Sequence, residues 1–149
     1  MFKEINEDDI LEKLESYALL LNKKLYVVGG VVRDEILGVK RASLIKDIDL
    51  TGTLHKDEIV EFLVGYNLNF EIKNEMLQVV SFWQKNDRIY EYARMRSEEY
   101  QNKNSHVPSK ISFVGKVEED AKRRDFTINS IFIFAISLFN SLVYCFHFS

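Results

Sequence analysis

A pair of glycines between an apolar run and a helical segment constrains this fold more than any other feature. Residues 25–28 (LYVV) form a short apolar run that stops at Gly29-Gly30, and residues 31–37 have the pattern of a short helix closed by Gly38. Glycine accepts the backbone conformations that so tight a turn requires. The segment therefore predicts a strand, a glycine turn and a helix, followed by a second strand over residues 45–50.

The rest of the chain predicts helices around a cluster of strands. Asn6 is a candidate cap for a first helix, whose buried stripe would contain Ile10, Leu14, Tyr17 and Leu21. The other expected elements are a helix over 55–66 with Ile59, Phe62 and Leu63 inward, strands over 68–73, 77–83, 88–96 and 111–114, a hairpin turn at Asn86-Asp87, a polar loop over 99–110 and a helix from 117 to about 130. This order predicts one α/β or α+β domain, with a small mixed sheet flanked by helices.

Composition excludes several classes of protein. With 149 residues, 46% of them hydrophobic, the chain can bury the core of one globular domain. Its single cysteine, Cys145, cannot form an internal disulfide, and the first residues carry acids where an export signal needs bases. We therefore expect a cytoplasmic protein without a membrane partner. The formal net charge of −3 argues against a broad basic surface for nucleic acid, so we expect any polyanion to bind at a local site.

Two acids two residues apart form the strongest chemical motif. In a strand, Asp47 and Asp49 project from one face while Ile48 and Leu50 pack the other way. Carboxylates at this spacing can bridge a pair of Mg²⁺ ions, which take oxygen ligands and suit phosphate chemistry. The alternative interpretation is a solvated strand end.

Four further residues extend this motif. Gly29 and Gly30 would let a phosphate approach the backbone, with Arg33 reaching back to it; the alternative is a plain turn with a surface arginine. Glu91 shares a strand face with Ile89, Ala93 and Met95, which we expect to turn toward the core. A carboxylate buried there would need a cation or a partner, so Glu91 is a candidate third metal ligand or one half of a salt bridge.

A basic cluster stands near the start of the last predicted helix. Residues 122–129 (KRRDFTIN) hold three bases, and Asp125 and Asn129 are i,i+4 neighbours that can hydrogen-bond a ribose or each other. A charge run of this kind also fits an ordinary solvated helix face.

Together, four segments resemble one family. The segments LYVVGGVVRDEILG, KDIDLTGT, YEYARMRSEEY and EEDAKRRDFTINS occur in this order over roughly residues 10–132. They are similar to the catalytic head of the bacterial CCA-adding tRNA nucleotidyltransferases and their poly(A) polymerase relatives. The resemblance implies a nucleotidyltransferase fold with the active site on one face of the sheet.

The resemblance also implies roles for individual residues. The reaction would use two Mg²⁺ ions, ATP and CTP, and an RNA 3′ end, with tRNA as the expected substrate. Loop 99–110 would correspond to the flexible loop of the head, SHVP standing where the family has a sequence like Arg-His-Pro. The implied catalytic and metal-binding residues are Asp47, Asp49 and Glu91, and the implied nucleotide-binding residues are Gly29, Gly30, Arg33, Arg124, Asp125 and Asn129.

The chain departs from the family after the RRDFTIN motif. We expect a head domain over residues 1–132 and an apolar tail over 133–149, with the family's neck and tRNA-binding body missing. Residues 126–149 contain no Asp, Glu, Lys, Arg, Gly or Pro. This end is interpreted as a truncated or out-of-frame sequence, as a membrane anchor, or as a segment that completes the core or joins a second chain.

Three functions remain open from the sequence. The leading one is untemplated addition of nucleotides to RNA 3′ ends, with CCA addition to tRNA foremost. The second is poly(A) addition by a relative, which the head motifs do not separate from the first. The third is a fragment that binds a nucleotide and Mg²⁺ without transferring anything. A partner chain or oligomer supplying the neck and body would complete an enzyme of the first kind.

Overall fold

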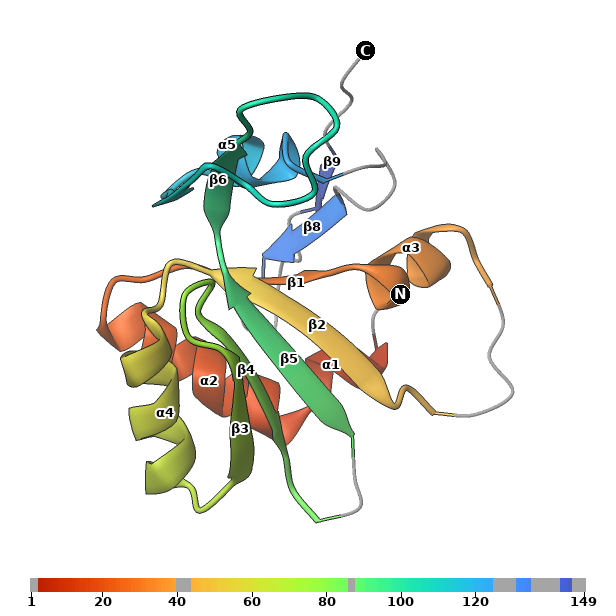
Figure 1. The fold of residues 1–149 in the computed structure, drawn as a ribbon. Coiled ribbons are helices and arrows are strands. Elements are labelled where there is room, and N and C mark those ends of the chain that lie inside the picture. The colour runs from red at the N-terminus through yellow and green to blue at the C-terminus, as the bar shows by residue number, and fades with distance from the viewer. Residues whose placement is uncertain (1–2, 40–43, 86–87, 125–130, 135–142, 146–149) are drawn as a thin grey trace.

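The computed structural model describes residues 3–39, 44–85, 88–124, 131–134 and 143–145. Helices and a cluster of consecutive strands follow one another along these residues, as expected for an α+β domain (Figure 1). The helices are α1 (Lys3–Asn6), α2 (Asp9–Leu20), α3 (Gly30–Ile36), α4 (Lys56–Gly65) and α5 (Val117–Ala121). The strands are β1 (Leu25–Val28), β2 (Asp47–Gly52), β3 (Asn69–Asn74), β4 (Val79–Trp83), β5 (Ile89–Arg94), β6 (Arg96–Glu99), β7 (Lys110–Phe113), β8 (Ile131–Phe134) and β9 (Val143–Cys145).

Seven of the described strands form one mixed sheet. Their order is β3-β4-β5-β2-β1-β8-β9, while β6 and β7 pair separately. Strands β2 and β5 run parallel, and the other described neighbours in the sheet run antiparallel. A parallel pair needs a crossover connection, which here contains α4, β3 and β4. The predicted fold class, a small mixed sheet flanked by helices, is therefore confirmed.

One face of this sheet is closed by helices and the other is open at β2 and β5. Ile48 and Leu50 of β2 are buried, whereas Asp47 and Asp49 are exposed. The alternation follows from the two-residue period of a strand. The buried side chains pack with Leu14 of α2 in the main core, together with Ile59, Phe62 and Leu63 of α4 as expected (Figure 1).

A second, smaller core covers the other face of β1. Tyr26 and Val28 pack with Met95, Val117 and Ala121, so α5 lies over the end of β1 on the side away from α2. Both faces of β1 are thus buried, which explains why its four residues form an unbroken apolar run. Figure 1 shows α5 and β6 standing at one end of the sheet, above the open face of β2.

The start of the first long helix differs from the expectation. Asn6 does not cap it, because Asn6 is the last residue of α1. Asp8 caps α2 instead, and its Oδ1 accepts the backbone N–H of Leu11 at 2.9 Å. The expected stripe is partly correct, since Leu14 is fully buried but Leu21 lies after the helix and is 39% exposed.

The later elements are shorter than expected. The strand predicted over 88–96 divides into β5 and β6 at Met95, whose backbone N–H bonds to Gly52 O at 2.9 Å. The last predicted helix ends at Ala121 as α5, and its continuation beyond residue 124 lies outside the described residues. The predicted turn at Asn86-Asp87 also lies outside them, while the predicted loop separates β6 from β7.

The described parts of the tail extend the sheet. Strand β8 pairs with β1, and β9 pairs with β8. Within the part of the chain that the structure describes, no helix combines the length and apolar character needed to cross a membrane. The division of the chain after residue 132 stays a prediction.

Gly52 offers a test of the β1–β2 register. It pairs with Leu25, and a Cβ at Gly52 would lie 2.1 Å from Lys24 O, a backbone atom. We expect Gly52→Ala to lower the free energy of unfolding by at least about 2 kcal/mol, because the backbone must shift to admit a methyl group. Gly65→Ala, at the end of α4 with open space around it, serves as the control and should be neutral or stabilising by up to about 1 kcal/mol. Urea unfolding curves measure both, and equal stability of the two variants would contradict the register.

Candidate active site

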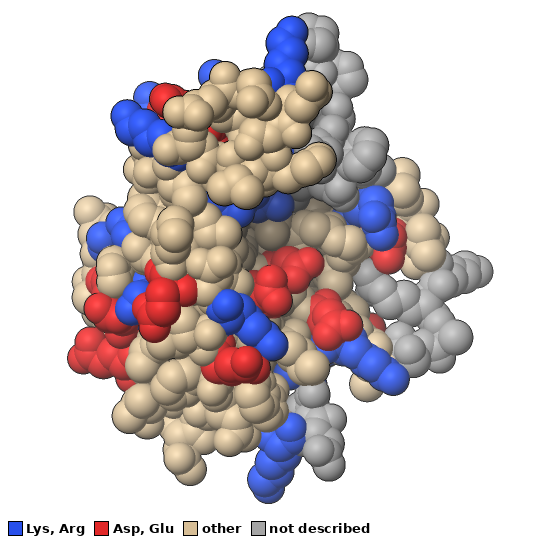
Figure 2. All heavy atoms as spheres, in the orientation of Figure 1, with Lys and Arg blue, Asp and Glu red and all other residues tan. Residues whose placement is uncertain are grey.

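The three predicted acids lie on the open face of two neighbouring strands. Parallel pairing places Asp49 of β2 directly beside Glu91 of β5, and Asp47 precedes Asp49 on the same face. All three residues are exposed. Figure 2 shows acidic side chains on this face, in a hollow below the end that carries α5, with basic side chains beside them. The strand register therefore brings the predicted carboxylates together.

The expected environment of Glu91 was wrong. We expected its face, with Ile89 and Ala93, to turn inward, but Ile89 is 47% exposed and the inward residues are Tyr90 and Tyr92. Two tyrosines can fill a core when their hydroxyl groups find acceptors, and Tyr92 Oη donates to Leu54 O at 2.8 Å. Glu91 is therefore not a buried charge that needs a cation, and its candidacy rests on its place beside Asp49.

The charges on this face act on one another at Asp49. The pKa of the Asp49 carboxyl is raised, first by partial burial and then by the negative charges of Glu91 and Asp47, whereas Arg124 opposes the shift. Acids that repel one another in this way are stabilised by an added cation. Partial burial and the neighbouring acids thus both disfavour the charged form of Asp49.

The glycine turn forms the wall beside Asp49. Gly29 follows Val28, the β1 residue paired with Asp49, and has φ of 79° and ψ of −152°. This backbone conformation is essentially restricted to glycine. A Cβ at Gly29 would lie 2.8 Å from Asp49 Oδ2. The glycine therefore leaves the aspartate carboxylate free of a neighbouring side chain.

Arg33 lies back over the same turn. Its Nη2 lies 3.4 Å from the position that a Cβ on Gly30 would take. The Arg33 Nε also contacts Asp34 Oδ1 at 3.1 Å, and the arginine side chain remains 40% exposed. An arginine placed in this way is accessible to an anion at the Gly29-Gly30 turn.

Arg124 approaches the acids from the α5 side and is held by a residue that the sequence analysis did not single out. Asp120 is fully buried, and its Oδ2 accepts Arg124 Nε at 3.1 Å and Nη2 at 3.0 Å. Its Oδ1 accepts Arg123 Nε and the backbone N–H of Arg96, each at 2.9 Å. Burial lowers the pKa of Arg124, and Asp120 opposes that change. The signal in the sequence was the spacing of Asp120 from two arginines at i+3 and i+4.

Two predicted site residues cannot be placed. Asp125 and Asn129 lie outside the described residues, so their proposed contacts with a nucleotide stay predictions.

The oxygen donors on the open face fit a hard cation whose remaining ligands are phosphate oxygens and water. In the described part of the chain, no three His, Cys, Asp or Glu side chains form a group that could hold a metal ion. Mg²⁺, however, is usually bound by one or two carboxylates together with substrate phosphates and water. Asp47 and Asp49 supply the carboxylates, and Gly29 leaves space beside them.

The raised pKa of Asp49 gives a prediction for stability in a metal-free buffer with a chelator. Because the folded state holds the Asp49 proton more tightly than the unfolded state, ionisation at neutral pH destabilises the fold. We expect Asp49→Asn to raise the free energy of unfolding at pH 7, and this gain should shrink as the pH falls through the pKa of Asp49.

The control for this prediction has the opposite sign. A hydrogen bond from Lys56 lowers the pKa of exposed Asp57, so Asp57→Asn should reduce stability at pH 7, with the loss shrinking in acid. Urea unfolding from pH 7 to below pH 4 measures both variants, because the loss in Asp57→Asn fades only below the ordinary carboxyl pKa, whereas the gain in Asp49→Asn fades above it. A loss of stability at pH 7 in Asp49→Asn, as in the control, would contradict the electrostatic interpretation.

Comparison with known sequences identifies relatives that match most of this chain. A bacterial protein of Streptococcus sanguinis (strain SK36), named "CCA-adding enzyme", is 33% identical over 122 residues, which are 82% of this chain and 27% of the relative. A protein of the same name from Staphylococcus aureus (strain Newman) is 34% identical over 122 residues, which again are 82% of this chain and 27% of the relative. The chain thus spans about a quarter of the length of these relatives.

Solved structures agree with the sequence comparison. An apo form of a CCA-adding enzyme superposes with a TM-score of 0.70 at 26% identity, covering 89% of this chain and 30% of that one. A complex of a CCA-adding enzyme with ATP gives a TM-score of 0.60 at 25% identity, covering 85% of this chain and 26% of that one. A tRNA nucleotidyltransferase complexed with a primer tRNA and an ATP analog shares the fold at 21% identity, with a TM-score of 0.62 over 89% of this chain and 34% of that one.

A match to a known family extends over most of the chain. Residues 25–144 match the family described as the Poly A polymerase head domain, and the predicted resemblance is confirmed. The chain belongs to the Poly A polymerase head domain family.

Proposed function

We propose that this chain is the catalytic head of a nucleotidyltransferase that adds nucleotides to RNA 3′ ends without a template, with CCA addition to tRNA as its reaction. The observation that carries the proposal is the parallel β2–β5 register, which sets Asp49 beside Glu91 on an open face. Gly29 and Arg124 approach the same aspartate from either side. Carboxylates, a glycine wall and arginines together suit the transfer of a phosphoryl group that carries negative charge.

A divalent metal is generally used by nucleotidyltransferases of this kind, and we propose Mg²⁺ for this chain. Asp47 and Asp49 would hold it, with Glu91 as the third carboxylate. Bound Mg²⁺ supplies Lewis-acid chemistry, which lowers the pKa of a hydroxyl and stabilises charge on phosphate oxygens.

The residues of the chain then have separate tasks in the transfer. The RNA 3′ oxygen attacks the α-phosphorus of the nucleotide, a new P–O bond forms, and the bond to the leaving pyrophosphate breaks. Arg33 and Arg124 offset the negative charge of the triphosphate, and the missing side chain at Gly29 lets it approach Asp49. Asp125 and Asn129 are proposed to contact the sugar. Most of the rate enhancement comes from positioning and electrostatics.

The proposed substrates follow from the relatives. The curated relatives are named as CCA-adding enzymes, and solved neighbours include complexes with ATP, with CTP and with a primer tRNA. We therefore propose ATP, CTP and a tRNA 3′ end as the partners of this chain. Poly(A) addition is the second candidate, because the matching family model describes a poly(A) polymerase head.

The proposal is tested on purified protein with Mg²⁺, a tRNA transcript lacking its CCA end and each nucleoside triphosphate, followed by sequencing of the RNA 3′ ends. We expect untemplated addition that Asp47→Ala and Asp49→Ala each reduce by at least about 1,000-fold, because each removes a metal-binding carboxylate. Asp57→Ala, which removes an exposed acid at the start of α4, is the control and should leave addition unchanged.

The identity of the added nucleotides separates the candidates. Addition of C, C and A supports the tRNA reaction, whereas runs of A support poly(A) addition. Full activity in a folded Asp47→Ala or Asp49→Ala variant would overturn the proposed role of the carboxylates. Absence of both addition and Mg²⁺-dependent nucleotide binding in the parent protein would overturn the proposed function.

Gly29 gives a second prediction for the same assay. Gly29→Ala should reduce addition by roughly 100-fold, because its methyl group would enter the space beside Asp49 and misplace the carboxylate. Gly38→Ala is the matched control, since Gly38 also has a positive φ of 69° but its Cβ would meet nothing within 4 Å. Both variants carry backbone strain, so only the difference between them reports on Asp49. Equal activity in the two variants would contradict the proposed contact.

A further inference from the structure

The segment before β2 is held by side chains in addition to one strand contact, the hydrogen bond from Ile89 N–H of β5 to Lys46 O at 2.7 Å. Ile45 lies two residues before Asp47, outside the strand, and is 7% exposed. Its backbone N–H donates to Glu4 Oε2 at 2.8 Å, and its carbonyl oxygen accepts Arg88 Nε at 3.0 Å. Both backbone polar groups of Ile45 are therefore bound by charged side chains from other parts of the chain.

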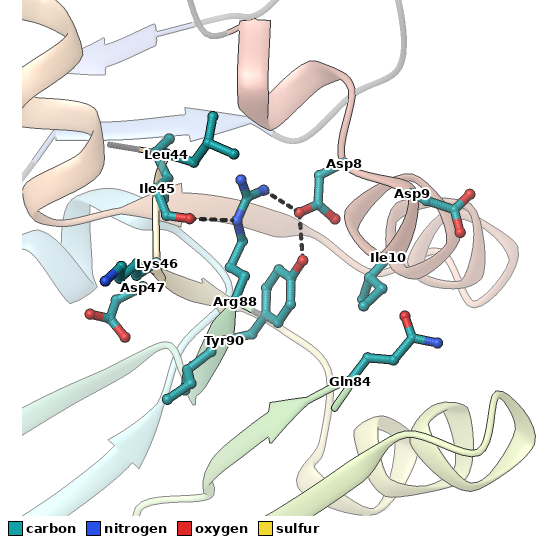
Figure 3. Close-up of a pocket in the computed structure, with 11 residues that line it drawn as sticks. Asp8, Asp9, Ile10, Leu44, Ile45, Lys46, Asp47, Gln84, Arg88 and Tyr90 are labelled. Carbon is teal, nitrogen blue, oxygen red and sulfur yellow. Dashed lines mark hydrogen bonds and ion pairs between the residues drawn. The ribbon is translucent and has the colours of Figure 1, made fainter. Parts of the chain in front are cut away.

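These side chains belong to a larger buried cluster. Arg88 Nη1 and Tyr90 Oη both donate to Asp8 Oδ2 (Figure 3). The Asp8 side chain is 5% exposed and that of Arg88 is 17% exposed. Arg88 also forms an ion pair with Glu4 at 3.4 Å. We call Glu4, Asp8, Arg88 and Tyr90 the N-terminal clasp.

Two residues of the clasp, Asp8 and Tyr90, are also held by contacts outside it. Asp8 Oδ1 caps α2 through the Leu11 N–H, while the ring of Tyr90 stacks on Phe82 at 5.0 Å between centroids. Burial and the neighbouring Asp8 raise the pKa of Tyr90, so its hydroxyl stays protonated and keeps donating. Charge-assisted hydrogen bonds between partly buried groups are among the strongest in proteins.

Asp47 needs this support more than Asp49 does. The described ladder between β1 and β2 runs from Gly52 to Asp49 and stops there, so Asp49 is flanked by strands on both sides. Asp47 is paired with β5 alone, at Ile89. Asp47 and Lys46 line a pocket of about 800 Å³, and Figure 3 shows Arg88, the residue before β5, reaching to Ile45 and Asp8. The clasp takes the place of the missing strand neighbour.

We propose that the N-terminal clasp positions Asp47 for metal binding, with Arg88 as its central residue. Arg88, Glu4, Asp8 and Tyr90 act through the backbone of Ile45 and touch no reacting atom, so they are positioning residues. The inference rests on the proposed function, because it assigns Asp47 to a metal. Residues that orient a metal ligand typically change metal affinity by about 10- to 100-fold when they are removed.

The test compares Arg88→Met with Lys56→Met. The control removes the contacts of Lys56 Nζ with Asp57 at 2.8 Å and Glu75 at 3.0 Å, away from β2. In Arg88→Met we expect amide hydrogen exchange of residues 44–48 to quicken at least about tenfold, because local opening becomes easier. We also expect the Mn²⁺ concentration for half-maximal nucleotide addition to rise about tenfold. Neither quantity should change in Lys56→Met.

If Arg88 only stabilises the fold and does not position Asp47, the experiment gives a different result. Arg88→Met would then lose thermal stability, while its exchange over residues 44–48 and its Mn²⁺ dependence stayed equal to those of Lys56→Met, and the proposal would be overturned. If Arg88→Met does not fold, Glu4→Ala decides, since it removes only the acceptor of the Ile45 N–H and the weaker ion pair. Glu4→Ala should show a smaller increase in amide exchange over residues 44–48 and a smaller increase in the Mn²⁺ concentration for half-maximal addition.

Failure of the proposed function is recognised separately. If the parent protein adds no nucleotide, amide exchange over residues 44–48 still decides whether the clasp holds the approach to Asp47. Faster exchange in Arg88→Met and in Glu4→Ala, without faster exchange in Lys56→Met, supports the positioning of Asp47. Unchanged exchange in both clasp variants overturns it.

Discussion

The parallel pairing of β2 with β5 is the contact on which the rest of this structure depends. It joins two strands that lie about forty residues apart and sets Asp49 beside Glu91 on one face. On the opposite face it aligns Ile48 and Leu50 with Tyr90 and Tyr92, which fill the main core. The hydrophobic effect on the closed face therefore holds together like charges that repel one another on the open face.

Two buried aspartates stabilise the two ends of this arrangement. Asp8 joins Arg88 and Tyr90 near the start of β2, and Asp120 joins Arg123 and Arg124 beyond α5. Each aspartate is buried, and each is paired with arginine, as a buried charge requires. Neither aspartate is one of the proposed metal ligands. The open face thus lies between two clusters in which a buried aspartate is paired with arginine, and Asp47, Asp49 and Glu91 belong to neither cluster.

The sequence predicted the parts of this site that depend on local pattern. The alternation of Asp47, Ile48 and Asp49 and the glycine turn required only a strand period and a backbone rule, and both are confirmed. The face of Glu91 was predicted wrongly, because Tyr90 and Tyr92 were not counted as core residues. The contact between Asp8 and Arg88 joins residues 80 apart, and no local pattern indicates it. Asp120 was one acid among several at a helix start, and only its spacing from Arg123 and Arg124 distinguished it.

The separation of Asp8 from Arg88 also bears on how the chain folds during synthesis. Strand β2 emerges from the ribosome well before its parallel neighbour β5 and before Arg88, the residue ahead of β5 that binds Ile45. Contacts between residues so far apart form slowly, because a long loop must close first. The nascent chain therefore leaves β2 without its parallel neighbour until β5 has been made, and β1 without its second neighbour until β8 follows. The open face is thus assembled only after residue 91 has been made, and the apolar strands left exposed before then favour aggregation.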